Sequence, residues 1–125
     1  WVSDMIAVSR GVCQMLRTDQ VRFRLDSHRG CRRYHQDNIT VRTVVTYYGQ
    51  GTEYLLRENV DWEAYKDGMD NDRIVIDRSD IRFIETWDVA AIRGGPGGLM
   101  HKTPEVALDQ PSVFLRVDPI DARLV

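Results

Sequence analysis

A His-x-Asp triplet, His35-Gln36-Asp37, and one distant histidine, His101, are the residues of this chain whose types best suit metal chemistry. Two imidazoles and one carboxylate are the ligand set of the facial triad that holds non-haem Fe(II). Such a triad leaves metal positions open for exchangeable ligands, whereas a structural zinc site closes them with protein side chains. The pattern therefore predicts a metal site formed by His35, Asp37 and His101.

A short His-x-Asp sequence also arises by chance, as a surface histidine beside a turn aspartate. The context favours a metal site, because strand-like sequence surrounds the triplet and His101 follows the glycine-rich bend 94–98. Cys31 is an even number of residues from His35 and Asp37, so on a strand all three side chains would point to the same face. A four-ligand zinc site that includes Cys31 is therefore an alternative. Four residues of extended strand span about 13 Å, which favours three ligands and leaves plain packing as the commonest role for Cys31.

The elements that must position these ligands are mostly short strands. Helical spacing of apolar residues predicts one amphipathic helix over 1–17. Strands are expected at 21–25, 31–37, 40–48, 54–56, 73–76, 81–86, 89–92, 99–101 and 113–117, with a polar loop at 58–72 holding at most one helical turn. One helix followed by short strands predicts an all-β fold, a double-stranded β-helix or jelly roll, because a parallel sheet would need helices between the strands.

The composition is that of an ordinary globular domain, with 42% hydrophobic residues and a net charge of −2. We expect a single domain over 1–125, with the metal-site core at about 31–118. The charge argues against nucleic acid as the main partner, and no apolar run approaches the roughly 18 residues that a membrane span needs. Two cysteines make no disulfide framework, so a reducing, cytoplasmic setting is expected.

The last predicted strand contains a candidate anion clamp, Arg116, whose strand face is shared by Ser112 and Phe114. An arginine that points into a barrel is costly to bury unless it meets a carboxylate. Its functional interpretation is a clamp for the distal carboxylate of 2-oxoglutarate. An outward-facing surface arginine is an equally good interpretation of the same pattern.

These motifs carry two resemblances. The triplet, the β-type run 42–48 ending in two tyrosines, the turn 49–52 and the later run 101–106 resemble the two metal strands of prolyl-hydroxylase-type iron and 2-oxoglutarate oxygenases. More closely, segments 31–37, 46–53, 88–90 and 98–104 are similar to a bacterial family known only as domain of unknown function 1826. Members of that family are often encoded near zinc-responsive genes, which implies a role under metal limitation.

The oxygenase resemblance implies Fe(II) and 2-oxoglutarate as cofactors, with Tyr47 or Tyr48 donating a hydrogen bond near the metal. It also implies a basic anchor at the start of the last strand, where this chain has Ser112, so that Arg116 one step deeper would substitute. The predicted function is thus an oxygenase acting on a small molecule or peptide, with the substrate and oligomeric state undetermined. The alternatives are a non-catalytic zinc-binding protein, in which Cys31 joins the ligand set, and a metal-free interaction module.

Overall fold

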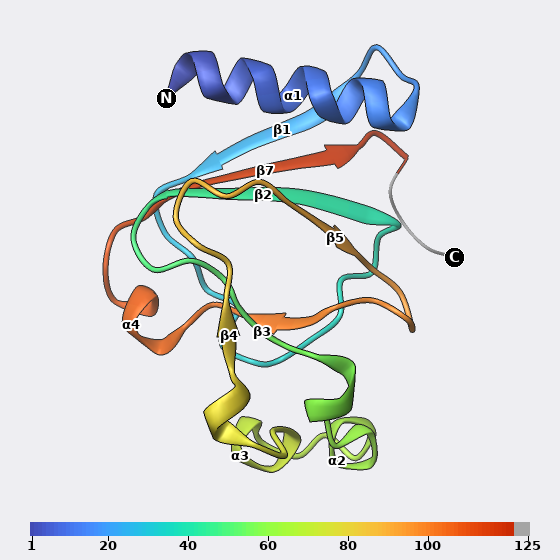
Figure 1. Cartoon of the computed structure of the whole chain (residues 1–125), viewed down its shortest axis with the longest axis vertical. Coiled ribbons are helices and arrows are strands. Elements are labelled where there is room, and N and C mark those ends of the chain that lie inside the picture. Colours follow the sequence, from blue (N-terminus) through green and yellow to red (C-terminus); the bar gives the residue numbers. More distant parts are fainter. Residues whose placement is uncertain (122–125) are drawn as a thin grey trace.

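The computed structural model describes residues 1–121 and contains two antiparallel β-sheets, with a long helix across the outer face of the larger one (Figure 1). The large sheet has the order β1-β7-β2-β5, formed by β1 (Val21–Asp26), β7 (Val113–Pro119), β2 (Val41–Tyr48) and β5 (Ala90–Arg93). The small sheet has the order β4-β3-β6, formed by β4 (Arg82–Phe83), β3 (Glu53–Leu55) and β6 (Met100–Lys102). The mostly-β class with one N-terminal helix, predicted from the sequence, is therefore confirmed.

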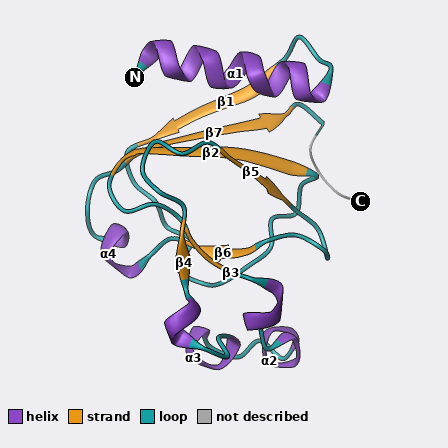
Figure 2. Cartoon of the chain, viewed as in Figure 1, coloured by secondary structure: helices purple, strands orange, loops and turns teal. Residues whose placement is uncertain are grey.

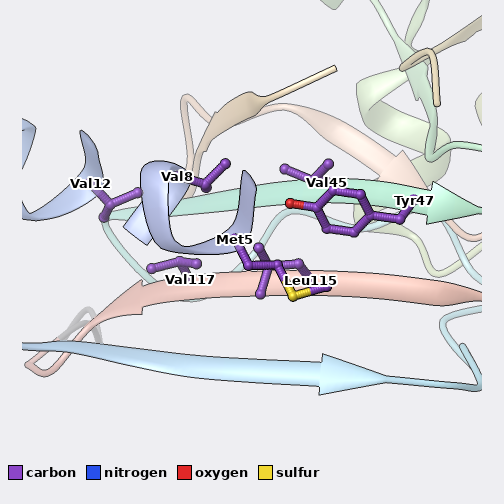
Figure 3. Packing of buried hydrophobic residues seen from close by; sticks show 7 residues of the cluster. All are labelled: Met5, Val8, Val12, Val45, Tyr47, Leu115 and Val117. Atoms are coloured by element: carbon purple, nitrogen blue, oxygen red, sulfur yellow. The ribbon is translucent and has the colours of Figure 1, made fainter. Parts of the chain in front are cut away.

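Helix α1 (Val2–Leu16) covers the large sheet with one apolar stripe (Figure 3). Met5, Val8 and Val12 recur at intervals of three and four residues, so they lie on one face of the helix and are buried. They pack on Val45 and Leu115, which are fully buried in the centre of the sheet. Burial of each such side chain contributes about 1.5–3 kcal/mol, which is what holds the helix in place.

The two central strands divide their side chains between two environments. Successive residues of a strand point to opposite faces, so Val45 and Val117 face α1. Val44, Phe114 and Arg116 face the other way and line a pocket on the side of the small sheet. The alternation in the sequence thus separates a hydrophobic core from a polar interior face.

A second core lies on the small-sheet side of the molecule, where helices α2 (Trp62–Lys66) and α3 (Asn71–Ile74) are found (Figure 2). Its fully or almost fully buried members are Tyr34, Leu55, Val60, Ile74 and Met100. Among the described residues, no helix combines the length and the apolar character needed to cross a bilayer.

Two expected elements differ from the structure. The region 58–72, expected as a loop with at most one helical turn, contains part of a 3-10 turn (Arg57–Asn59), helix α2 and the start of α3, and the strand expected at 73–76 begins as helix α3. Both helices start at aspartates, Asp61 and Asp70, whose side chains accept a hydrogen bond from the backbone three residues on and so begin a helical turn. The short helix α4 (Glu105–Leu108) was not expected at all.

The segment 31–37 is also not a regular strand. It is paired with β6 only at His35 and His101, which form an isolated antiparallel bridge. The side chain of Asn71 takes up the neighbouring backbone groups instead, accepting from Tyr34 N at 3.0 Å and donating to Arg32 O at 2.9 Å. A side chain thus replaces the strand partner that this part of the chain lacks.

Candidate metal centre

The structure brings His35, Asp37 and His101 together. One ligand atom from each residue lies within 4.8 Å of the others. His35 Nε2 is 3.5 Å from Asp37 Oδ1, and His101 Nε2 is 3.5 Å from Asp37 Oδ2. The two imidazole rings have their centroids 4.5 Å apart. Two nitrogen donors and a carboxylate therefore converge on one point from segments more than sixty residues apart in sequence.

Backbone pairing sets the two histidines side by side. His35 N donates to His101 O, and His101 N donates to His35 O, both at 3.0 Å. In an antiparallel pair of this kind the two side chains project from the same face of the sheet. Thr103 N also donates to Cys31 O at 2.9 Å, which extends the contact along the segment.

The glycine-rich bend 94–98 supports the other side of the triplet. Gly95 N donates to Asp37 O at 2.8 Å, and Gln36 Nε2 donates to Gly98 O at 2.9 Å. A Cβ atom at Gly94 would lie only 1.9 Å from Ile39 O, so only glycine allows this approach of the two backbones. The bend thus fixes the place of Asp37.

Both imidazoles are oriented by backbone carbonyls. His35 Nδ1 lies 2.8 Å from Arg33 O, and His101 Nδ1 lies 3.0 Å from Leu99 O. A carbonyl only accepts hydrogen bonds, so Nδ1 of each neutral ring carries the proton and Nε2 keeps its lone pair. Metal-ligating histidines are held in this way, with the distal nitrogen free to coordinate.

Asp37 is almost fully buried and is only partly satisfied. Arg42 Nη1 donates to Asp37 Oδ1 at 3.2 Å, while Asp37 Oδ2 is buried and has no hydrogen-bond partner among the described residues. An unsatisfied carboxylate oxygen is costly in the interior, and a metal ion would satisfy it. The donor set, the tautomers and this orphaned oxygen together fit a divalent metal with open positions.

The charges of the cluster are mutually dependent. Burial raises the pKa of Asp37, but the hydrogen bond with His35 and the charges of His101 and Arg42 outweigh it, so the net pKa is lowered. The hydrogen bond that the protonated His35 ring donates to Asp37 raises the pKa of His35, so this ring must release its Nε2 proton when a metal binds, whereas burial lowers the pKa of His101. Asp37 is therefore held as a carboxylate, and His101 is held neutral, which are the forms that bind metal.

The triad opens onto a pocket of about 230 Å³ between the two sheets. Its apolar wall comes from the large sheet and consists of Val44, Ile92 and Phe114. Its polar wall is strongly basic and includes the side chains of Arg24, Arg29, Arg42, Lys102 and Arg116. An apolar wall with a few charged groups beside a metal site is the general character of a small-molecule pocket.

Of three other predicted site residues, Arg116 lies at the pocket and the two tyrosines do not. Arg116 lines the pocket, so its strand face is the interior one. Tyr47 lies on the opposite face of the sheet, where its hydroxyl donates to Asp4 at 2.5 Å, and the side chain of Tyr48 is exposed. The alternation of side chains along β2 explains this orientation, because Tyr47 is two residues from Val45 and points to the same face of the sheet, away from Val44. The structure therefore brings neither tyrosine to the metal.

Ser112 and Cys31 also lie apart from the ligand cluster. Ser112 is buried against Gly49, and its hydroxyl has no hydrogen-bond partner among the described residues. Cys31 is exposed and lines the pocket, but it does not belong to the group of converging ligand atoms.

Four basic residues of the pocket, Arg24, Arg29, Arg42 and Lys102, were not predicted from the sequence as site residues. Arg42 is two residues from Val44 in a predicted strand, so the two side chains point to the same, interior face of the sheet. Arg29 lies in a predicted turn, where no periodicity indicates its direction. Only the folded chain shows that this side chain is buried.

Comparisons with known proteins give a family but no activity. No curated protein and no solved structure matches the chain significantly. One family model, described as "Protein of unknown function (DUF1826)", matches residues 1–118, which is nearly the whole chain. The match includes all three converging residues and every strand of the pocket wall except the end of β7. The chain therefore belongs to the DUF1826 family of proteins of unknown function.

Proposed function

We propose that this protein is a non-haem Fe(II)- and 2-oxoglutarate-dependent oxygenase. The observation that carries the proposal is the convergence of His35, Asp37 and His101, with both Nε2 atoms turned towards the carboxylate. Two histidines and one carboxylate with open metal positions are characteristic of Fe(II) oxygenases. The adjoining basic pocket suits an anionic cosubstrate such as 2-oxoglutarate.

The order of the strands supports a double-stranded β-helix as the fold behind this function. The large sheet runs β1-β7-β2-β5, and the small sheet runs β4-β3-β6. Adding segment 31–37 beside β6, where His35 pairs with His101, gives four strands facing four. Jelly rolls have eight strands in two such sheets, and their ligand sites lie between the sheets.

In the proposed enzyme the chain supplies ligand geometry and a selective pocket. His35, Asp37 and His101 hold the metal, the carbonyls of residues 33 and 99 keep the two imidazoles oriented, and Arg42 keeps the carboxylate in place. The apolar wall limits access of water to the site. When bound, Fe(II) with 2-oxoglutarate supplies the oxidative chemistry.

The test measures metal content and turnover in matched variants. The wild-type protein, incubated with Fe(II), 2-oxoglutarate and oxygen, is expected to form succinate slowly even without a prime substrate. His35→Ala is expected to lose metal and succinate formation together, because one of three ligands is gone. Asp72→Ala is the control, since Asp72 is exposed and lies outside both the converging ligand atoms and the lining of the pocket. Metal retained in full by His35→Ala would contradict the proposal.

A zinc-binding role is the second candidate, favoured by the position of Cys31 on the same pocket. It requires the thiol to move into the ligand set, giving a closed site with four protein ligands. Cys31→Ser would then lower zinc affinity strongly, whereas it leaves the three-ligand site of an oxygenase unchanged. Both cysteines are free thiols in the structure.

A further inference from the structure

Arg29 is a buried cation in the wall of the metal pocket. It lies in the loop after β1, and only 9% of its surface is exposed. Nη1 donates to Gln50 O at 2.6 Å, and Nη2 donates to Thr52 Oγ1 at 2.9 Å. The guanidinium also lies 4.5 Å from the centre of the Phe114 ring. These contacts fix its position but supply no negative charge.

The other basic residues of the pocket have acidic partners. Arg42 is held by both oxygens of Asp118, at 2.9 and 3.0 Å. The remaining pairs are Lys102 with Glu53 at 3.4 Å, Arg24 with Asp26 at 2.8 Å and Arg116 with Asp26 at 3.7 Å. Within residues 1–121, no ion pair includes Arg29.

An unpaired buried guanidinium is costly to the folded protein. Burial lowers the pKa of Arg29 to about 10, so the side chain is still charged at neutral pH. A buried charge is normally compensated by an opposite charge with good hydrogen-bond geometry. The missing partner of Arg29 is therefore expected to be an anion that enters the pocket.

We propose that Arg29, rather than Arg116, binds the far carboxylate of a dicarboxylate whose other end lies at the metal triad. This inference rests on the proposed function, which it completes by naming the anchor. Both ends of such a ligand would lie in one pocket, because Arg29, His35 and His101 line the same cavity. The ring of Phe114 and the side chains of the apolar wall suit the methylene groups between the two carboxylates.

Arg116 is less suited to this role although it lines the same pocket. Its charge is shared with Arg24 through a single carboxylate, that of Asp26. Arg116 Nε has no hydrogen-bond partner among the described residues, but Asp26 at 3.7 Å already offsets part of its charge, whereas no acid of the described chain is paired with Arg29. The guanidinium of Arg29 also lies 4.5 Å from the centre of the Phe114 ring, and its hydrogen bonds to Gln50 and Thr52 use only two of its five N–H donors.

The test compares two ligands on the metal-loaded full chain by titration calorimetry. The metal is Mn(II), so that no turnover occurs. The ligands are 2-oxoglutarate and 2-oxopentanoate, which differ only in having a methyl group in place of the far carboxylate. Arg29→Gln is expected to weaken 2-oxoglutarate binding about 10- to 100-fold, as for loss of a charge-assisted hydrogen bond, and to leave 2-oxopentanoate binding within about twofold. Arg116→Gln tests the rival anchor, and Arg78→Gln, at an exposed arginine outside the lining of the pocket, is the matched control.

Each outcome decides the question. An equal loss for both ligands in Arg29→Gln would show a structural role and overturn the inference. A loss specific to the far carboxylate in Arg116→Gln alone would assign the anchor to Arg116. Equal wild-type affinity for the two ligands would exclude a far-carboxylate anchor, whereas binding of neither ligand to the metal-loaded protein would contradict the 2-oxoglutarate oxygenase itself.

Metal uptake separates this inference from the proposed function. A wild-type protein that binds no Mn(II) or Fe(II) contradicts the oxygenase itself, and the anchor with it. If Arg29→Gln does not fold, Arg29→Lys replaces it, because lysine keeps the charge and loses the fork. Arg29→Lys is then expected to lower 2-oxoglutarate affinity while binding 2-oxopentanoate as the wild type does, and equal losses for the two ligands would overturn the inference.

Discussion

At the scale of single residues, the site depends on how each ligand is held rather than on its presence alone. Two backbone carbonyls set the tautomers of His35 and His101, and neither carbonyl belongs to a conspicuous motif. Arg42 joins Asp37 of the metal cluster to Asp118 of the large sheet. A candidate metal ligand is thereby braced against the opposite side of the pocket, and in metal sites such outer partners tune metal affinity.

Tyr47 offers a prediction about alkaline pH. Burial, and then its hydrogen bond to Asp4, raises the pKa of Tyr47 above its usual value of 10. Because the folded state holds this proton more tightly than the unfolded chain, the associated stability is complete below pH 10 and is lost as the pH rises further. Urea unfolding of the wild type should therefore show a steeper loss of stability above pH 10 than Tyr47→Phe.

At neutral pH, the difference in the free energy of unfolding between the same two proteins measures how much the Tyr47–Asp4 hydrogen bond contributes to stability. Tyr47→Phe is expected to unfold about 1–3 kcal/mol more easily, because it removes a hydrogen bond to a charged group. Identical pH profiles for the two proteins above pH 10 would show that another group controls alkaline unfolding. Tyr34, whose pKa is also raised by burial and by its hydrogen bond to Glu53, remains as a common background in both proteins.

At the scale of elements, segment 31–37, which contains two of the three candidate ligands, is held by parts of the chain that are not strands. Asn71, at the start of α3, bonds the backbone on both sides of residue 33. The bend 94–98 bonds the backbone of Asp37 from the other side. Segment 31–37 is thus fixed between a helix and a glycine turn, with β6 beside it.

Asn71→Ala is expected to weaken metal binding although Asn71 touches no ligand atom. The two backbone groups of residues 32 and 34 would lose their partners, which costs about 1–3 kcal/mol and loosens the position of His35. Asp72→Ala is the control, since this neighbour is exposed and forms only a surface ion pair with Arg78. The measurements are Mn(II) affinity by calorimetry and the midpoint of thermal unfolding, and equal metal affinity in the two variants would refute the bracing role.

Sequence patterns located most of the strands but not these supports. Helical and alternating periodicity predicted α1, β1, β2 and β7 to within a few residues, because each has one apolar face and long runs. The region 58–80 was misjudged because its helices are one turn or two long, and capping aspartates read equally well as loop residues. Periodicity requires more than one turn to be visible.

At the scale of the whole molecule, the pocket beside the candidate metal ligands lies between two sheets, each of which packs against its own hydrophobic core. One core lies between α1 and the large sheet, and the other lies on the small-sheet side with α2 and α3. The interior faces in between carry the polar groups, including buried Asp37 and Arg29. The two hydrophobic cores stabilise the fold, and this stability offsets the cost of the buried charged residues between the two sheets.

Metal binding is therefore expected to stabilise the whole fold. A metal that binds only the native state at one hundred times its dissociation constant adds about 2.7 kcal/mol. Saturating Mn(II) should raise the thermal midpoint of the wild type and leave that of His101→Ala nearly unchanged. Thermal unfolding followed by circular dichroism measures these midpoints, and addition of a chelator should return the wild-type midpoint to its metal-free value. An equal rise in both proteins would indicate metal bound elsewhere.

The sequence by itself determined the ligand types, the helix, the longer strands and the face that Arg116 shares, because these depend on residue chemistry and local periodicity. Only the tertiary structure decided that His101 pairs with His35 and that Tyr47 points away from the pocket towards Asp4. It also decided that Arg29 is buried with no acidic partner among residues 1–121. Burial and pairing between distant segments depend on how the sheets fold over one another. No local pattern in the chain contains that information.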